Sequence, residues 1–249
     1  MDLNRISESL NQKLLRIRQR IDKSMASENS EQLESGRLLA YLEEVAANPT
    51  LVNIARAARE LSPHRESLGR LGLTLRCLSS FTFEPLVAAI ELQGLRAGIS
   101  LNVVVGPFGQ IEQGLIDPAF WHDKESKQHE VMLIAGRLRD ACPAVYEEFN
   151  SLEFERARQL ITDWHGRLGS ALGEFRKRSK APVLIQNHEQ PASPAMGLAD
   201  AGPNSQSGLI REANEELRSI AKEVGSAYVM DYDSLTARHG RERWSDPRT

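Results

Sequence analysis

Polar segments follow five short apolar runs of the sequence, and they hold the side chains that could do chemistry. They are Ser79-Ser80-Phe81-Thr82, Gly106-Pro107-Phe108-Gly109-Gln110, Gly136-Arg137, Asn187-His188-Glu189 and Asp231-Tyr232-Asp233. Four of the five carry a hydroxyl, an amide or a carboxylate, groups that bind polar ligands or transfer protons. Gly106 and Gly109 can adopt backbone conformations that turn amides toward an anion. The segments are therefore the candidate lining of a polar pocket, although loops after strands are commonly polar.

Histidine spacing does not indicate a metal site. The six histidines stand at positions 64, 122, 129, 165, 188 and 239, and no two have the spacing of metal ligands. The sequence also lacks a Walker loop, a Gly-x-Gly-x-x-Gly fingerprint and a Gly-x-Ser-x-Gly elbow. We therefore expect no metal and no cofactor. His188, beside Glu189, could serve as an oriented base, although such a pair is more often a surface feature.

The segment Asp231-Tyr232-Asp233 looks like the Asp-x-Asp motif of HAD-type phosphotransferases. In that motif the first carboxylate is the nucleophile and both carboxylates help to hold Mg²⁺. A HAD core needs a hydroxyl, a lysine and further carboxylates downstream, but only 18 residues follow Asp231. Leu235 also stands where the motif has Thr or Val. We expect no HAD active site at these residues.

The elements that must position these side chains alternate between strand and helix from residue 73 onward. Apolar runs predict strands over 73–79, 99–105, 131–135, 182–186 and 227–230, and longer periodic stretches predict helices over 85–95, 152–178 and 210–224. This alternation predicts an α/β fold, a three-layer, five-stranded parallel sheet with helices on both faces. Ligands of such sheets bind beyond the carboxyl ends of the strands. The polar segments above should therefore meet at one edge.

The first 70 residues predict helices. Apolar residues recur every three or four positions in three sets: Leu3, Ile6, Leu10, Leu14, Ile17 and Ile21; then Leu38, Leu39, Leu42 and Val45; then Leu51, Ile54, Ala55, Ala58 and Leu61. Asn48-Pro49 is typical of a helix start and predicts where the third helix begins. We divide the chain into a helical segment, 1–70, and an α/β domain, 71–249. Residues 191–208, rich in Pro, Gly, Ala and Ser, predict a long loop.

Composition excludes several classes of protein. The 249 residues carry 31 basic and 34 acidic side chains and are 41% hydrophobic. This balance suits a folded domain and favours neither nucleic acid nor a membrane surface as a partner. No apolar run reaches the roughly 20 residues of a membrane helix, and Cys77 and Cys142 are too few for a disulfide scaffold. Without a secretory signal, we expect a cytoplasmic protein.

Taken together, the polar segments resemble the amino-terminal region of FkbH-like proteins. Besides those segments, the blocks that carry the resemblance are Pro85-Leu86, Gln113, Asp117-Pro118, Gln190-Pro191, Asn214, His239-Gly240-Arg241 and Arg243-Trp244-Ser245-Asp246-Pro247-Arg248. They cover residues 73 to 248 in order. The resemblance implies an SGNH/GDSL-hydrolase-type sheet domain, which in that family precedes a HAD-type catalytic domain. The present chain would be a C-terminally shortened form of it, with no HAD domain.

The resemblance also implies a process. The family is associated with loading a glyceryl unit from a phosphorylated three-carbon donor onto an acyl carrier protein, in polyketide-type biosynthesis, and its HAD domain carries that chemistry. The implied partners are an acyl carrier protein and a HAD-type catalytic domain, supplied in trans or missing from this chain. The domain described by these residues would then be an accessory one.

The residues that match an SGNH catalytic site are incomplete. Aligning the first block places Phe81 at the nucleophile, and a shift of one residue places Ser80 there. Gly106 fits the second block, Leu138 replaces the oxyanion Asn, and Thr249 stands where the base should be, although Asp246 is retained. A serine without its base loses several orders of magnitude in rate.

Two hypotheses follow. The first is a catalytically silent SGNH-like domain that supports glyceryl or acyl transfer to a carrier protein, with a polar pocket lined by Ser79, Ser80, Thr82, Gly106, Gln110, Asn187, Glu189 and Asp246. The second is a serine esterase or acyl-transferring hydrolase that uses Ser80, with His188 or His239 as base; Asp246 is a further catalytic candidate.

Overall fold

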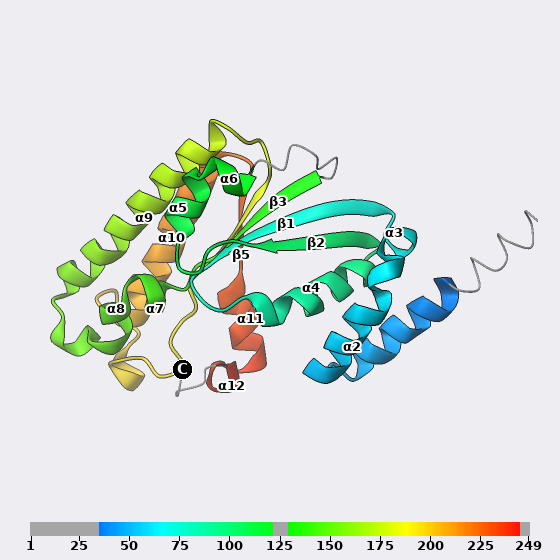
Figure 1. Ribbon diagram of the computed structural model, residues 1–249. Helices are drawn as coiled ribbons and strands as arrows, with labels where there is room; N and C mark the ends of the chain where they lie inside the picture. The colour runs from blue at the N-terminus through cyan, green and yellow to red at the C-terminus, as the bar shows by residue number, and fades with distance from the viewer. Residues whose placement is uncertain (1–34, 122–128, 245–249) are drawn as a thin grey trace, which may run out of the picture. The chain divides into compact units, whose positions relative to one another are not determined.

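The five predicted strands form one parallel sheet. The computed structural model describes residues 35–121 and 129–244, and the strands follow the order β2-β1-β3-β4-β5 (Figure 1). Their bounds are β1 Leu71–Ser79, β2 Ile99–Val105, β3 His129–Ala135, β4 Val183–Gln186 and β5 Ala227–Met230. The predicted α/β class is confirmed, and each strand lies within two residues of its predicted bounds.

Strand register aligns the polar segments. Ser79 pairs with Ala135 at the carboxyl ends of β1 and β3, and Gln186 pairs with Met230 at those of β4 and β5. The segments that begin at Ser80, Gly136, Asn187 and Asp231 therefore leave the sheet at the same edge. This is the edge at which parallel sheets bind their ligands.

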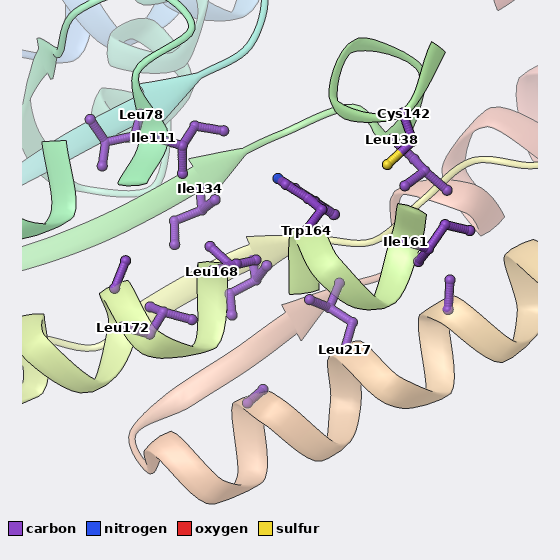
Figure 2. Close-up of a cluster of buried hydrophobic side chains, with 14 of the residues drawn as sticks. Leu78, Ile111, Ile134, Leu138, Cys142, Ile161, Trp164, Leu168, Leu172 and Leu217 are labelled. Atoms are coloured by element: carbon purple, nitrogen blue, oxygen red, sulfur yellow. The ribbon is translucent and has the colours of Figure 1, made fainter. Parts of the chain in front are cut away.

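Three helices cover one face of the sheet: α5 (Ile111–Ile116), α9 (Phe154–Arg176) and α10 (Gln206–Val224). Their apolar stripes and the strands make the largest core cluster, part of which is drawn in Figure 2. Leu168 and Leu172 of α9 and Leu217 of α10 are fully buried there, with Ile134 of β3. The spacing of three or four residues that predicted these helices is the spacing that buries one face.

The other face carries a smaller cluster under α4 (Glu84–Arg96). Val87 and Ile90 of α4 pack against buried Leu75, Cys77 and Leu133 of the strands. Short helices complete the sheet unit: α6 Pro118–Trp121, α7 Leu138–Ala141, α8 Pro143–Glu147, η2 Phe149–Ser151, η3 Gly197–Ala199, α11 Tyr232–His239 and α12 Arg241–Trp244.

Helix α10 begins four residues before its predicted start at 210. The side chain of Ser205 accepts a hydrogen bond from Gly208 N at 3.0 Å, and the buried carboxylate of Asp200 accepts from Gln206 N at 3.2 Å and from Ser207 N at 2.8 Å. These caps satisfy the amides of the first turn. The loop predicted over 191–208 therefore ends too late. The first turn of α10 is polar, so it lacks the recurring apolar residues from which a helix is predicted.

A helical unit comprises residues 35–71 and 91–100 among those described. It holds a helix over 35–47, α2 Leu51–Leu61, η1 Ser62–His64 and α3 Arg65–Leu68 around the buried side chains of Leu42, Leu61, Leu92 and Leu95. The predicted start of α2 at Asn48-Pro49 is wrong by two residues, because Thr50 caps it through Asn53 N at 3.2 Å.

The apolar stripe predicted from Leu3 to Ile21 lies outside the described residues. Over 35–121 and 129–244, no helix combines the length and the apolar character needed to cross a bilayer. The sheet unit comprises residues 72–90 and 101–244 of the described chain.

Gly208 offers a test of the packing at the start of α10. A Cβ built there would lie 2.6 Å from Gly202 O and 2.7 Å from Pro203 O. Because backbone atoms cannot move aside, we expect Gly208→Ala to lower the free energy of unfolding by about 1–3 kcal/mol. Urea denaturation measures this loss as a lower midpoint at unchanged slope.

Gly166→Ala is the matched control. Gly166 lies in the middle of α9, and its Cβ would meet nothing within 4 Å. Alanine is more favourable than glycine inside a helix, so the free energy of unfolding of this variant should rise by up to about 1 kcal/mol. Equal midpoints for the two variants would contradict the packing described here.

Candidate functional site

The hydroxyl of Ser80 is held by a carboxylate and an amide. Ser80 Oγ donates to Asp140 Oδ2 at 2.6 Å and accepts from Arg137 N at 2.9 Å. The Arg137 guanidinium fixes Asp140 in turn, through Nε to Oδ2 at 2.8 Å and Nη2 to Oδ1 at 3.0 Å. It also lies 5.2 Å from the ring of Phe81. The Ser80 side chain thus joins the segments after β1 and β3 through two hydrogen bonds, and two more bonds fix the Asp140 carboxylate within the second segment.

A cleft of about 590 Å³ opens beside this serine, and we call it the Ser80 cleft. Its lining includes Ser80, Phe108, Gly109, Arg137, Asp140 and Trp164. Gly109 has a φ of +68°, and its amide donates to Ser79 O at 3.0 Å. Positive φ is costly for residues with a Cβ, so glycine allows the loop after β2 to turn back toward β1 at this point.

The described partners of the Ser80 hydroxyl do not include an imidazole. In a serine triad the imidazole takes the proton of the nucleophile and returns it to the leaving group. A carboxylate that accepts this hydroxyl is a weaker proton acceptor, and the lining of the Ser80 cleft contains no histidine. The cleft as described holds a serine without the usual shuttle.

His188 lies in the interior, paired with a second histidine. Its ring is 0% exposed, and its Nε2 lies 3.0 Å from Nε2 of His165. His165 Nδ1 in turn lies 2.7 Å from Glu216 Oε2. With the proton of His165 on Nδ1 and that of His188 on Nε2, each bond has one donor and one acceptor. His188 Nδ1 is then left without a partner.

Burial keeps this pair neutral. Desolvation, with a smaller contribution from the neighbouring His165, lowers the pKa of His188 to about 3. Desolvation also lowers the pKa of His165, although its bond to Glu216 acts in the opposite direction. A neutral, buried and already bonded ring is suited to packing, and the structure does not bring His188 to Ser80. His239 is exposed on α11 and stacks at 5.5 Å on Trp244.

The segment after β4 is fastened to two helices. The Asn187 side chain donates to Asp231 Oδ1 at 3.0 Å and accepts from Asp233 N at 2.9 Å. The backbone of His188 exchanges two hydrogen bonds with the side chain of Asn214 on α10, at 2.8 and 2.9 Å. Gln190 N donates to Asp233 Oδ1 at 2.8 Å. Asn187 therefore has a structural role, joining the segment after β4 to the start of α11.

The Asp231-Tyr232-Asp233 segment has a structural role as well. Asp231 caps α11 by accepting from Ser234 N at 3.2 Å and Ser234 Oγ at 2.6 Å, and these bonds lower the pKa of its carboxyl group. Asp233 pairs with Arg241 at 2.8 Å. Among the described residues, no group of three or more His, Cys, Asp or Glu side chains could hold a metal ion.

A second, smaller pocket adjoins the first, and we call it the Arg139 pocket. It has a volume of about 110 Å³, and its lining includes Arg137, Arg139, Tyr146, Glu189, Tyr232 and Arg241. Arg137 and Arg139 line both this pocket and the Ser80 cleft. Burial raises the pKa of the Glu189 carboxyl, the phenol of Tyr146 and that of Tyr232.

The other predicted pocket residues lie elsewhere. Ser79 accepts from Phe81 N at 3.0 Å within its own turn, and Thr82 is exposed. Gly106 is a packing position, since a Cβ there would lie 2.6 Å from Leu78 Cδ2. Gln110 is exposed at the start of α5, and Asp246 lies outside the described residues. Of the predicted set, Ser80 and Glu189 line neighbouring pockets.

Sequence reasoning missed the residues that complete these pockets. Asp140 is 60 residues from Ser80, and Arg139, Tyr146 and Arg241 come from three different helices. No local spacing connects them. The one available signal was the run Arg137-Leu138-Arg139-Asp140 directly after β3, in which three charged side chains surround one buried leucine.

Comparisons with known proteins identify a shared fold. No protein-family model matches the chain, and no curated protein matches it. Among solved structures, the chain is similar to the crystal structure of the N-terminal part of the protein BF1531 from Bacteroides fragilis, which contains a phosphatase domain complexed with Mg. The TM-score is 0.57 at 16% identity, over 79% of this chain and 49% of that one. The chain thus spans about half the length of that protein part.

The buried histidine predicts how stability depends on pH. Unfolding exposes His188, whose pKa then returns from about 3 to its ordinary value near 6.5. Below pH 6.5 His188 binds a proton in the unfolded chain but not in the folded chain. The free energy of unfolding therefore falls as the pH falls. Between pH 7 and pH 5, His188 should account for a loss of about 2 kcal/mol in the free energy of unfolding.

His188→Gln removes this titration. The loss between pH 7 and pH 5, measured by urea denaturation at each pH, should shrink in the variant by about 2 kcal/mol. His129→Gln, at an exposed position where β3 begins, is the control and should keep the wild-type loss. If His188→Gln loses as much stability as the wild type on acidification, the assignment of a neutral buried His188 is wrong.

Proposed function

We propose that this chain is an accessory, catalytically silent SGNH-like domain of the FkbH-like type. It would support glyceryl or acyl transfer to an acyl carrier protein, together with a HAD-type catalytic domain that acts in trans or belongs to the same protein. The observation that carries the proposal is the Ser80 hydroxyl, which bonds to Asp140 and to the Arg137 amide in place of an imidazole. The cleft beside it is lined by no histidine among the described residues.

Two further observations support it. The fold is shared with the N-terminal part of a protein that contains a phosphatase domain, and this chain matches about half of that length. Phe108, at the lining of the Ser80 cleft, is 67% exposed. An exposed aromatic side chain beside a cleft is a common anchor for a protein partner. We place the carrier or the catalytic domain against this residue.

Binding to purified partners tests the proposal. The immobilised chain should retain a purified acyl carrier protein or a purified HAD-type protein, and Phe108→Ser should lower the amount retained by at least about fivefold. Leu198→Ser is the control, because Leu198 is fully exposed on the loop before α10 and lines neither pocket. If the wild-type chain retains neither partner, the proposal fails.

The alternative function is a serine esterase or acyl-transferring hydrolase. The feature that favours it is the short bond of 2.6 Å from the Ser80 hydroxyl to a carboxylate, which orients the oxygen at the cleft. Under our proposal a fluorophosphonate probe leaves Ser80 unlabelled, and p-nitrophenyl acetate is hydrolysed no faster than in buffer. Labelling that disappears in Ser80→Ala but persists in Ser170→Ala, at an exposed serine of α9, would establish the hydrolase instead.

A further inference from the structure

The Arg139 pocket has a composition that neither proposed function uses. Its walls come from five places: the segment after β3 with α7, helix α8, the segment after β4, helix α11 and helix α12. Three of its lining residues are arginines and one is a carboxylic acid. Guanidinium groups are the preferred ligands of phosphate and carboxylate oxygens in proteins, because their N–H donors match pairs of oxygens.

The lining of the pocket has more basic than acidic residues. Arg137 pairs with Asp140 at 2.8 Å and Arg241 pairs with Asp233 at 2.8 Å. Arg139 forms no ion pair with a described carboxylate, and its guanidinium lies 5.4 Å from the ring of Tyr146. Glu189 is the acidic residue of the lining, and burial raises the pKa of its carboxyl group. The lining itself thus has three arginines against one carboxyl group, since Asp140 and Asp233 do not line the pocket.

Buried polar atoms in the same walls also lack partners. They are Glu189 Oε2, Gln190 Oε1 and Arg241 Nε, and all three residues line the Arg139 pocket. Buried polar atoms are almost always hydrogen-bonded, because leaving one unpaired costs stability. Three unpaired atoms around one cavity indicate a ligand that supplies both acceptors and donors.

We propose that the Arg139 pocket binds the phosphate group of a small phosphate monoester. Its arginines come from two separate parts of the chain, the segment after β3 with α7 and helix α12. A phosphate presents three terminal oxygens in different directions, whereas a carboxylate presents two in one plane. The phosphate therefore suits donors that approach from different sides. The singly protonated phosphate group of such an ester supplies an O–H donor as well as acceptor oxygens, which matches the unpaired acceptors Glu189 Oε2 and Gln190 Oε1 and the unpaired donor Arg241 Nε. The volume of about 110 Å³ is small, so only the phosphate enters.

The rest of the ester has a place to lie. A wide groove of about 930 Å³ shares Gln190, Pro191, Ala192 and Arg241 with the pocket. Arg211, Arg238 and Arg243 add positive charge to its lining, against Asp233 and Glu242. This inference does not depend on the carrier-protein proposal, since a phosphate site here could exist with or without that partner.

Isothermal titration calorimetry at constant ionic strength tests the site with three probes: orthophosphate, methyl phosphate and acetate. The full chain should bind both phosphates and bind acetate at least about tenfold more weakly. Arg139→Gln should weaken the binding of methyl phosphate by about tenfold or more, because it removes a charged hydrogen bond. Arg139→Lys keeps the positive charge but lacks the paired N–H donors of a guanidinium. Its affinity for methyl phosphate should therefore lie between that of the wild type and that of Arg139→Gln.

Arg156→Gln is the matched control, at an exposed arginine in the first turn of α9 that lines neither the pocket nor the groove. It should bind methyl phosphate as the wild type does. Circular dichroism and thermal unfolding confirm that each variant is folded before it is titrated. Equal loss in Arg156→Gln and Arg139→Gln, equal affinity for acetate, or binding of orthophosphate with exclusion of methyl phosphate would each overturn the proposal.

Discussion

The side chain of Asn187 fixes the part of the sheet's carboxyl edge on which the Arg139 pocket depends. Its amide donates to Asp231 and its carbonyl accepts from Asp233 N, so one residue after β4 holds the turn after β5. Asp233, placed in this way, binds Gln190 N and Arg241. The position of Arg241 in the Arg139 pocket is therefore set by contacts that begin at Asn187. An apolar residue at 187 would leave two segments without a common anchor.

A second anchor lies one residue further along. Asn214 of α10 exchanges two bonds with the backbone of His188, which orients the His188 ring toward His165 and away from the edge. The same contact presents the next side chain, Glu189, to the Arg139 pocket. The two adjacent residues thus have different roles. The His188 ring is buried and neutral, whereas the Glu189 carboxyl group faces the Arg139 pocket.

The strands were predictable because buried parallel strands are continuous apolar runs, as in 131–135. Helix α9 was predictable from its apolar period, whereas the start of α10 depends on Asp200, a cap six residues before Gln206 that no period announces. For the site, the sequence predicted only that it lies at the carboxyl edge of the sheet. The pairing of Ser80 with Asp140 and of His188 with His165 links residues 60 and 23 positions apart, and only the folded sheet brings them together.

The two pockets differ in how their charges are balanced, which separates their roles. Among the residues that line the Ser80 cleft, Arg137, Arg139 and Arg167 stand against Glu112, Asp140 and Glu147. Arg167 lies 3.6 Å from Glu112, and Arg137 pairs with Asp140, so the lining of this cleft carries no excess charge. The lining of the Arg139 pocket has three arginines and one carboxylic acid, Glu189. Because Arg137 and Arg139 belong to both linings, an anion held in the smaller pocket would change the field at Ser80 without touching its hydroxyl.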